Sequence, residues 1–149
     1  MSVGLLFEAD EHVSQWICDY YGWKRFMQYE YCVGLLKDEK LVGAIFLHGF
    51  NGNDLHLSYY GERTLTPGIA RTMAQFIISQ FDPARLTVIV SKRNKRLIRS
   101  CGRFGFKLEG VQRCYYGKDD CNRNTGVRLV AFRDAIDRVA NTAALKKVA

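Results

Sequence analysis

The stretch Thr66-Pro67-Gly68-Ile69-Ala70-Arg71 stands at the start of a long helical pattern and has the composition of an anion-binding turn. The first backbone N–H groups of a helix have no partner within the helix and carry partial positive charge, so they attract phosphate groups. Gly68 and Ala70 lack the bulky side chains that would keep a pyrophosphate away from these amides. The turn therefore indicates a site for a phosphorylated molecule, although Pro-Gly is also a common way to begin a helix.

A strand-like segment over residues 54–60 carries a second group of reactive side chains. Side chains alternate along a strand, so Asp54, His56 and Ser58 share one face. Tyr59 lies on the opposite, more apolar face. A histidine has an ordinary pKa near 6.5 and exchanges protons close to neutral pH. His56 is therefore a candidate proton acceptor, although a single histidine on a strand is more often a structural hydrogen-bonding residue.

Basic residues concentrate between Lys92 and Arg113. This window holds eight Lys and Arg residues and one acid, Glu109, whereas acids and bases cancel in the rest of the chain. The whole formal charge of +7 is therefore local. Such a patch fits a polyanionic partner, either a phosphorylated cofactor or nucleic acid, and the alternative is a solvated helix face.

The overall composition describes an ordinary globular domain. The chain has 149 residues, of which 48% are hydrophobic and 25% charged, so we expect one domain over residues 1–149 with its own core. It has no signal-peptide pattern and no apolar run long enough to span a membrane. Its five cysteines form no Cys-x-x-Cys pair and its histidines lack zinc-ligand spacing, which predicts reduced thiols, no metal site and a cytoplasmic location.

The elements that must position these residues follow from hydrophobic periodicity and turn signals. We expect strands over residues 3–9, 31–36, 41–48, 54–60, 85–91, 106–116 and 126–132, and helices over 10–22, 67–81, 95–103 and 134–149. Asp10 and Asn94 are the expected N-caps of two of the helices. This order predicts an α+β fold with a mixed, mostly antiparallel sheet of about seven strands, flanked by helices. The strand-helix-strand unit over 54–91 implies a parallel pair of strands inside that sheet.

One pattern in the chain is specific enough to suggest a family. After Asn94 comes the run Phe104-Gly105-Phe106-Lys107-Leu108-Glu109-Gly110-Val111-Gln112-Arg113. With the strand before it, this run resembles the acetyl-CoA-binding half of the GCN5-related N-acetyltransferases (GNATs), in particular the small phage-type and ribosomal-protein-acetyltransferase-like members. The resemblance covers roughly Leu41 to Phe132. It implies a three-layer GNAT-like fold, acetyl-CoA as acetyl donor, and direct transfer to a small-molecule or protein amine.

The resemblance also implies a set of cofactor contacts. Gly68-Ile69-Ala70 fits the last positions of the family's phosphate loop, but Leu65 stands where the family has Gln or Arg, so Arg63 or Arg71 would supply the missing cation. Asn94 matches the asparagine that contacts the pantetheine arm. The expected cofactor-binding residues are Tyr59, Thr66, Gly68, Ile69, Ala70, Arg71 and Asn94.

Many family members carry a tyrosine that protonates the departing CoA thiolate, and Cys101 occupies that position here. A thiol could do this work, although Arg99 and Arg103 should lower its pKa, and a packing role is the alternative. Tyr115 or Tyr116, on the following expected strand, could replace it as the acid. His56 is the expected base, with Glu62 in reserve. No spacing suggests a covalent acyl-enzyme.

Two other functions fit the same residues. The first is a nucleic-acid-binding or nucleic-acid-modifying protein, which would use the basic patch together with aromatic side chains for stacking. These aromatic residues are Tyr20, Tyr21, Trp23, Phe26, Tyr115 and Tyr116. The second is a catalytically inactive interaction module, which Leu65 and Cys101 would favour. The sequence identifies no particular acceptor, and it fits either a monomer or a homodimer.

Overall fold

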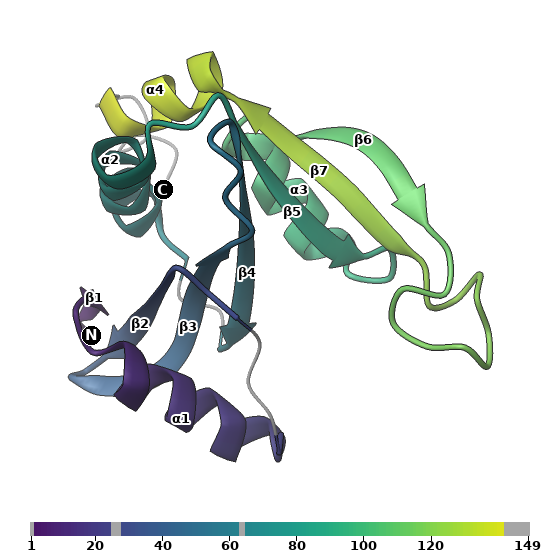
Figure 1. The fold of residues 1–149 in the computed structure, drawn as a ribbon, viewed down its shortest axis with the longest axis horizontal. Helices are drawn as coiled ribbons and strands as arrows, with labels where there is room; N and C mark the ends of the chain where they lie inside the picture. The colour runs from purple at the N-terminus through teal and green to yellow at the C-terminus, as the bar shows by residue number, and fades with distance from the viewer. Residues whose placement is uncertain (1, 25–27, 63–64, 142–149) are drawn as a thin grey trace.

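The computed structural model describes residues 2–24, 28–62 and 65–141 as one seven-stranded mixed sheet with helices on both faces (Figure 1). The strands are β1 (Val3–Leu6), β2 (Tyr31–Lys37), β3 (Lys40–His48), β4 (Asp54–Gly61), β5 (Arg85–Ser91), β6 (Lys107–Gln112) and β7 (Gly126–Phe132). The helices are α1 (Asp10–Tyr21), α2 (Pro67–Phe81), α3 (Lys95–Arg103) and α4 (Arg133–Asn141). The strand order is β1-β2-β3-β4-β5-β7-β6, in which β4 and β5 are parallel and every other pair is antiparallel. The predicted α+β fold and its parallel pair are confirmed.

The helices form two layers around the sheet (Figure 1). On one face, α1 buries Val13 and Ile17 in a cluster with side chains of β2 and β3, among them Phe46. On the other face, α2 and α4 cover the inner strands, and α3 packs Cys101 against β5 and β7. The middle of β3 is buried on both faces, which explains its nearly continuous apolar sequence. Within the described ranges, no helix has the length and apolar content needed to cross a membrane.

Several predicted boundaries were wrong. The first strand ends at Leu6 because Glu8 adopts a left-handed conformation with φ of 58°. The N-cap of α1 is Ala9, and the Asp10 carboxylate accepts the N–H of Cys32 instead, at 3.0 Å. The strand predicted over residues 106–116 ends at Gln112. The last helix begins at Arg133, and the part predicted for 142–149 lies outside the described residues.

The cysteine prediction was also wrong for one pair. Cys114 and Cys121 form a disulfide, whereas Cys18, Cys32 and Cys101 are free thiols. The turns that connect β6 to β7 bring the pair together, and the Cys114 N–H donates to the Cys121 carbonyl at 3.2 Å. Their separation of seven residues is not a recognisable motif, so only the folded connection shows that they meet.

The feature that positions the site is a split in the middle of the sheet. Strands β4 and β5 pair only from Asp54 to His56 and from Arg85 to Thr87. Beyond that point β4 stays with β3 and β5 stays with β7, each to its end, so the two halves of the sheet diverge (Figure 1). The facing backbone edges, residues 57–61 and 88–91, are not paired with each other. A sheet that opens in this way leaves room for a ligand between its strands.

Candidate active site

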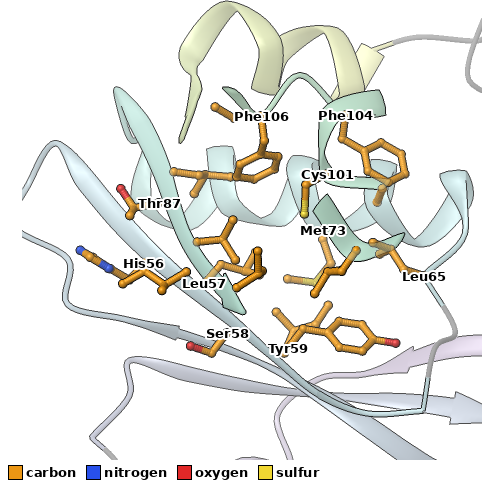
Figure 2. A pocket seen from close by; sticks show the side chains of 18 of the residues that line it. His56, Leu57, Ser58, Tyr59, Leu65, Met73, Thr87, Cys101, Phe104 and Phe106 are labelled. Atoms are coloured by element: carbon orange, nitrogen blue, oxygen red, sulfur yellow. The ribbon is translucent and has the colours of Figure 1, made fainter. Parts of the chain in front are cut away.

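A cavity of about 400 Å³ fills the split (Figure 2). Its walls come mainly from β4, β5, α2, α3 and the β6–β7 connection, with further residues of β3, β7 and α4, and most of its lining is apolar. It extends from the side covered by α2 and α3, where Met73 and Cys101 lie, to the opposite side of the strands, where His56 and Thr87 lie. A volume of this size is within the range of sites for small molecules. Two reactants that approach from opposite faces of the sheet could therefore meet in it.

The structure brings together six of the ten residues predicted for the site. The three predicted catalytic residues, His56, Cys101 and Tyr115, all line the cavity. Of the predicted cofactor-binding residues, Tyr59, Ala70 and Asn94 line it, whereas Thr66, Gly68, Ile69 and Arg71 lie at the N-terminus of α2 outside the lining. Leu65 also contributes to the wall, so an apolar side chain occupies the position where the family carries Gln or Arg.

The N-terminus of α2 is built by Thr66. Its hydroxyl accepts the Ile69 N–H at 3.2 Å, and its carbonyl accepts the Ala70 N–H at 2.9 Å, so two of the amides expected to hold phosphate already have partners. At Gly68, an added Cβ would meet only the Thr66 hydroxyl, at 3.8 Å. The backbone at Gly68 is therefore open to an approaching group. Arg63, the other expected cation of this turn, lies outside the described residues.

Two further predicted cofactor contacts have roles within the fold. The Asn94 side chain accepts the Leu97 N–H at 3.2 Å, which confirms it as the N-cap of α3. The Tyr59 hydroxyl donates to the Glu62 carbonyl. Both residues therefore shape the rim of the cavity, and Figure 2 shows Tyr59 on the same side of it as Leu65.

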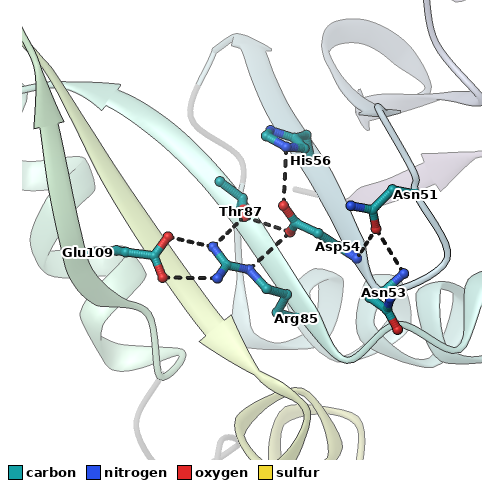
Figure 3. A network of polar contacts seen from close by, with 7 residues as sticks. All are labelled: Asn51, Asn53, Asp54, His56, Arg85, Thr87 and Glu109. Atoms are coloured by element: carbon teal, nitrogen blue, oxygen red, sulfur yellow. Dashed lines mark hydrogen bonds and ion pairs between the residues drawn. The ribbon is translucent and has the colours of Figure 1, made fainter.

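His56 belongs to a chain of polar contacts that crosses the sheet (Figure 3). Its Nε2 lies 3.3 Å from Oδ2 of Asp54. The other oxygen of Asp54 accepts the hydroxyl of Thr87 at 2.7 Å and Nε of Arg85 at 3.3 Å. The Arg85 guanidinium also donates twice to Glu109, at 2.6 and 3.0 Å. Asp54 is thus fixed from β5 and orients the His56 ring.

Arg85 and Glu109, at the end of this series of polar contacts, form a charge-assisted, bidentate ion pair. The hydrogen bonds from Arg85 lower the pKa of Glu109, and those to Glu109 raise the pKa of Arg85. Glu109 lies where the register of β6 on β7 is irregular, between Leu108 and Gly110. From the sequence, Glu109 was noted as the one acid of the basic window and as part of a motif, without a partner. Its partner lies 24 residues away and two strands across the sheet, so no local signal pointed to the pair.

A second histidine, which the sequence analysis did not single out, stands beside His56. The His48 and His56 ring centroids are 5.6 Å apart, and Nε2 of His48 lies 2.8 Å from the Ser58 hydroxyl. Burial lowers the pKa of His48, and the neighbouring His56 lowers it further. His48 is therefore uncharged at neutral pH. The pairing register of β3 with β4 places His48 directly opposite His56. A prediction of that register from the sequence would have identified His48 as a neighbour of His56.

The pKa of Cys101 is shifted in the direction opposite to the prediction. Arg99 and Arg103 were expected to lower its pKa, but both are exposed, whereas Cys101 is only 7% exposed. Burial raises the pKa of its thiol to about 11. Figure 2 shows the sulfur pointing into the cavity near Met73. At neutral pH, Cys101 therefore presents a protonated thiol in apolar surroundings.

Tyr115 and Tyr116 reach the cavity from the β6–β7 connection and not from a strand. The Tyr116 hydroxyl donates to the Ile89 carbonyl of β5 at 3.2 Å, and burial raises its pKa to about 12. The Tyr115 ring packs edge-on against Tyr116, with centroids 4.8 Å apart. The disulfide that includes Cys114 closes this connection.

The basic patch lies away from the aromatic side chains of α1. Its α3 members, Lys95, Arg96, Arg99 and Arg103, are exposed on the helix that covers the same face as α2 and α4. Tyr20, Tyr21 and Trp23 form a chain of ring contacts at the end of α1, on the opposite face. Phe26 lies outside the described residues. Among the described residues, no group of three or more His, Cys, Asp or Glu side chains could hold a metal ion.

Comparison with solved structures decides the fold. A spermidine N-acetyltransferase chimera from Vibrio cholerae and hSSAT superposes with a TM-score of 0.70 over 93% of this chain and 99% of that one, at 9% identity. The chain has the GNAT fold. Ard1 from Thermoplasma volcanium gives a TM-score of 0.65 over 89% of this chain and 98% of that one, at 10% identity. No protein-family model matches the chain, and no curated protein sequence matches it.

A third similar structure belongs to a ribosomal-protein acetyltransferase, the kind of protein that the sequence resembles. The ribosomal-protein-S5-alanine acetyltransferase from Vibrio fischeri gives a TM-score of 0.57 over 70% of this chain and 62% of that one, at 13% identity. At such identities the likeness is one of fold. Within the GNAT fold, the chemistry of this chain depends on its own residues at the split between β4 and β5.

Proposed function

We propose that the protein transfers the acetyl group of acetyl-CoA directly to a primary amine. The observation that carries this proposal is the split between β4 and β5, which opens a cavity to both faces of the sheet. A donor on the side of α2 and α3 and an acceptor on the side of His56 would reach the same point between the strands. The GNAT fold of the chain supports the same assignment.

The residues present fit acetyl-CoA. Beyond His56 and Thr87 the facing backbone edges of β4 and β5 are not paired with each other, and they offer N–H and C=O groups to the amides of a pantetheine arm. The open backbone at Gly68 and the positive end of α2 suit a diphosphate. Arg71 and the exposed cations of α3 would neutralise further phosphate charge. Acetyl-CoA supplies the thioester, a reactive acetyl group on a good leaving group.

His56 is the proposed base. The attacking amine nitrogen forms a bond to the acetyl carbon and loses a proton, which the His56 imidazole accepts directly or through water. Asp54, at 3.3 Å, holds the ring in position and stabilises the imidazolium that results. The C–S bond of the thioester then breaks, and the CoA sulfur leaves with the electron pair.

The leaving sulfur takes a proton from a second group. Cys101 and Tyr115 both line the cavity, and they are the two candidates for this donor. Burial raises the pKa of Cys101 to about 11, and its side chain is only 7% exposed, so water has little access to replace a proton that it donates. Tyr115 is about half exposed, so water can replace a proton that its hydroxyl donates. We therefore assign the donor role to Tyr115 and a packing role to Cys101. Replacing Cys101 with Ala should leave turnover within about threefold of wild type, whereas a 10²-fold loss, of the order of general acid catalysis, would restore Cys101 as the acid.

The test is an acetyl-transfer assay read by mass spectrometry. The purified chain is incubated with acetyl-CoA and a panel of primary amines, and the acetylated amine and free CoA are both quantified. Equal amounts of the two products support transfer of the acetyl group from acetyl-CoA to the amine. Acetyl groups found on the protein itself in place of the amine would contradict it. Salt-sensitive binding of short DNA or RNA without acetyl transfer would favour the nucleic-acid function instead.

The nucleic-acid function has weaker support from the structure. It would need cations and stacking rings on one surface, but α3 lies on the opposite face of the sheet from Tyr20, Tyr21 and Trp23. The other two expected rings within the described residues, Tyr115 and Tyr116, line the cavity between β4 and β5. We also propose that residues 1–149 form one cytoplasmic domain, which is a monomer or a homodimer. Light scattering after size-exclusion chromatography would distinguish these two states.

A further inference from the structure

The part of the cavity on the His56 side has an aromatic wall. Three tyrosines contribute to it: Tyr60 from β4, and Tyr115 and Tyr116 from the β6–β7 connection. Tyr115 and Tyr116 are about half exposed, so their rings are accessible at the mouth of the cavity. An aromatic wall attracts flat apolar groups by stacking and single ammonium groups by cation–π interaction.

The wall is held in place before any ligand arrives. The Tyr60 ring packs edge-on against Trp23 at 5.2 Å and against Tyr21 at 5.9 Å. The hydrogen bond from Tyr116 to the Ile89 carbonyl fastens the other side to β5. Little rotamer freedom is therefore lost when a ligand binds between these rings.

The part of the lining that the structure describes carries no acid. Among the described residues, no Asp, Glu, Lys or Arg side chain lines the cavity. Asp54, behind His56, already has Thr87, Arg85 and His56 as partners. His48 is uncharged at neutral pH because burial lowers its pKa. An acceptor with several ammonium groups would have to bury them without a carboxylate, which is costly.

We propose that the acceptor is a primary amine with a single positive charge, carried on an aromatic body such as an arylalkylamine. This inference rests on the proposed acetyl transfer and adds the substrate class. The ring of the acceptor stacks between Tyr60 and Tyr115, and its amino group lies toward His56. The spermidine N-acetyltransferases that share the fold act, by name, on a polyamine, whereas the proposed acceptor of this chain carries one charge.

The test compares initial rates of CoA release with 2-phenylethylamine, tryptamine, spermidine and 1,4-diaminobutane at fixed acetyl-CoA. We expect kcat/KM for the two aromatic amines to exceed that for spermidine at least tenfold. Replacing Tyr115 with Leu should raise KM for 2-phenylethylamine about three- to tenfold, the value of one aromatic contact. Tyr115→Phe keeps the ring and should keep KM, whatever the loss of the hydroxyl does to kcat. Phe132→Leu is the matched control, because Phe132 is 51% exposed, close to the 49% of Tyr115, and lies outside the cavity.

The outcomes separate this inference from the proposed function. If spermidine is the better substrate, or Tyr115→Leu leaves KM unchanged, the aromatic acceptor is wrong and acetyl transfer stands. If acetyl-CoA binds but none of the four amines is acetylated, the acceptor class is equally refuted. If acetyl-CoA does not bind at all, the proposed function fails, and the acceptor class fails with it.

Discussion

Replacing His56 with Gln tests the assignment of the base. Removal of a general base typically costs 10²–10⁴ in rate. The His56 side chain is 28% exposed, so water can reach it and carry part of the proton transfer in the variant. We therefore expect the lower end of that range, a fall in kcat of about 10²-fold at pH 7, equivalent to about 2.7 kcal/mol. KM for acetyl-CoA should change little, because His56 lies on the side of the strands away from α2 and α3.

The assay is a pH profile of kcat from CoA release between pH 6 and 9. A general base gives the pH profile of kcat an acid limb, and His56→Gln should flatten that limb. The matched control is His12→Gln, because His12 is exposed on α1 and does not line the cavity. A variant at His56 with wild-type kcat and an unchanged pH profile would refute the reasoning and make His56 a structural residue.

Three further predictions concern Gly68, Cys101 and His48. Gly68→Trp should abolish acetyl-CoA binding without unfolding the chain, since the space at Gly68 is open, while Gly68→Ala keeps binding; micromolar affinity in the Trp variant would contradict the phosphate site. Because burial raises the pKa of Cys101 to about 11, its alkylation by iodoacetamide, followed by mass spectrometry, should accelerate until about pH 11 and not level off near pH 8.5. The lowered pKa of His48 means that its contribution to stability is present above about pH 6.5 and is lost as the pH falls through its value in the folded state. Melting temperatures between pH 7.5 and 5 should therefore fall more steeply for the wild type than for His48→Gln, and parallel curves would show that His48 is not responsible.

Local patterns predicted the elements that hold the site. The Pro-Gly start of α2, the Asn94 cap of α3 and the parallel pairing of β4 with β5 were all found in the structure. Each depends on residues close together in sequence, or on a topological rule with few exceptions. The alternation that put Asp54 and His56 on one face follows from the same short-range geometry.

Contacts between distant segments were not predictable in this way. The partner of Asp54 is Arg85, 31 residues further along the chain, and Arg85 in turn reaches Glu109 across β7. The disulfide between Cys114 and Cys121 depends on how the β6–β7 connection folds. The pKa of Cys101 was predicted in the wrong direction because basic neighbours in sequence suggested charge, whereas burial decides the outcome. Burial is a property of the packed structure, so charge patterns alone did not reveal it.

Binding of acetyl-CoA is the central claim, and a calorimetric and thermal-shift titration tests it most directly. We predict one acetyl-CoA per chain. At a ligand concentration about 100 times Kd it should stabilise the fold by about 2.7 kcal/mol, and the melting temperature should rise by about 5–11 °C. The same titration is repeated with short DNA and RNA in place of acetyl-CoA and at two salt concentrations. If acetyl-CoA gives no heat of binding and no shift in melting temperature, while nucleic acid binds with an affinity that falls steeply with salt, the proposed binding of acetyl-CoA is contradicted.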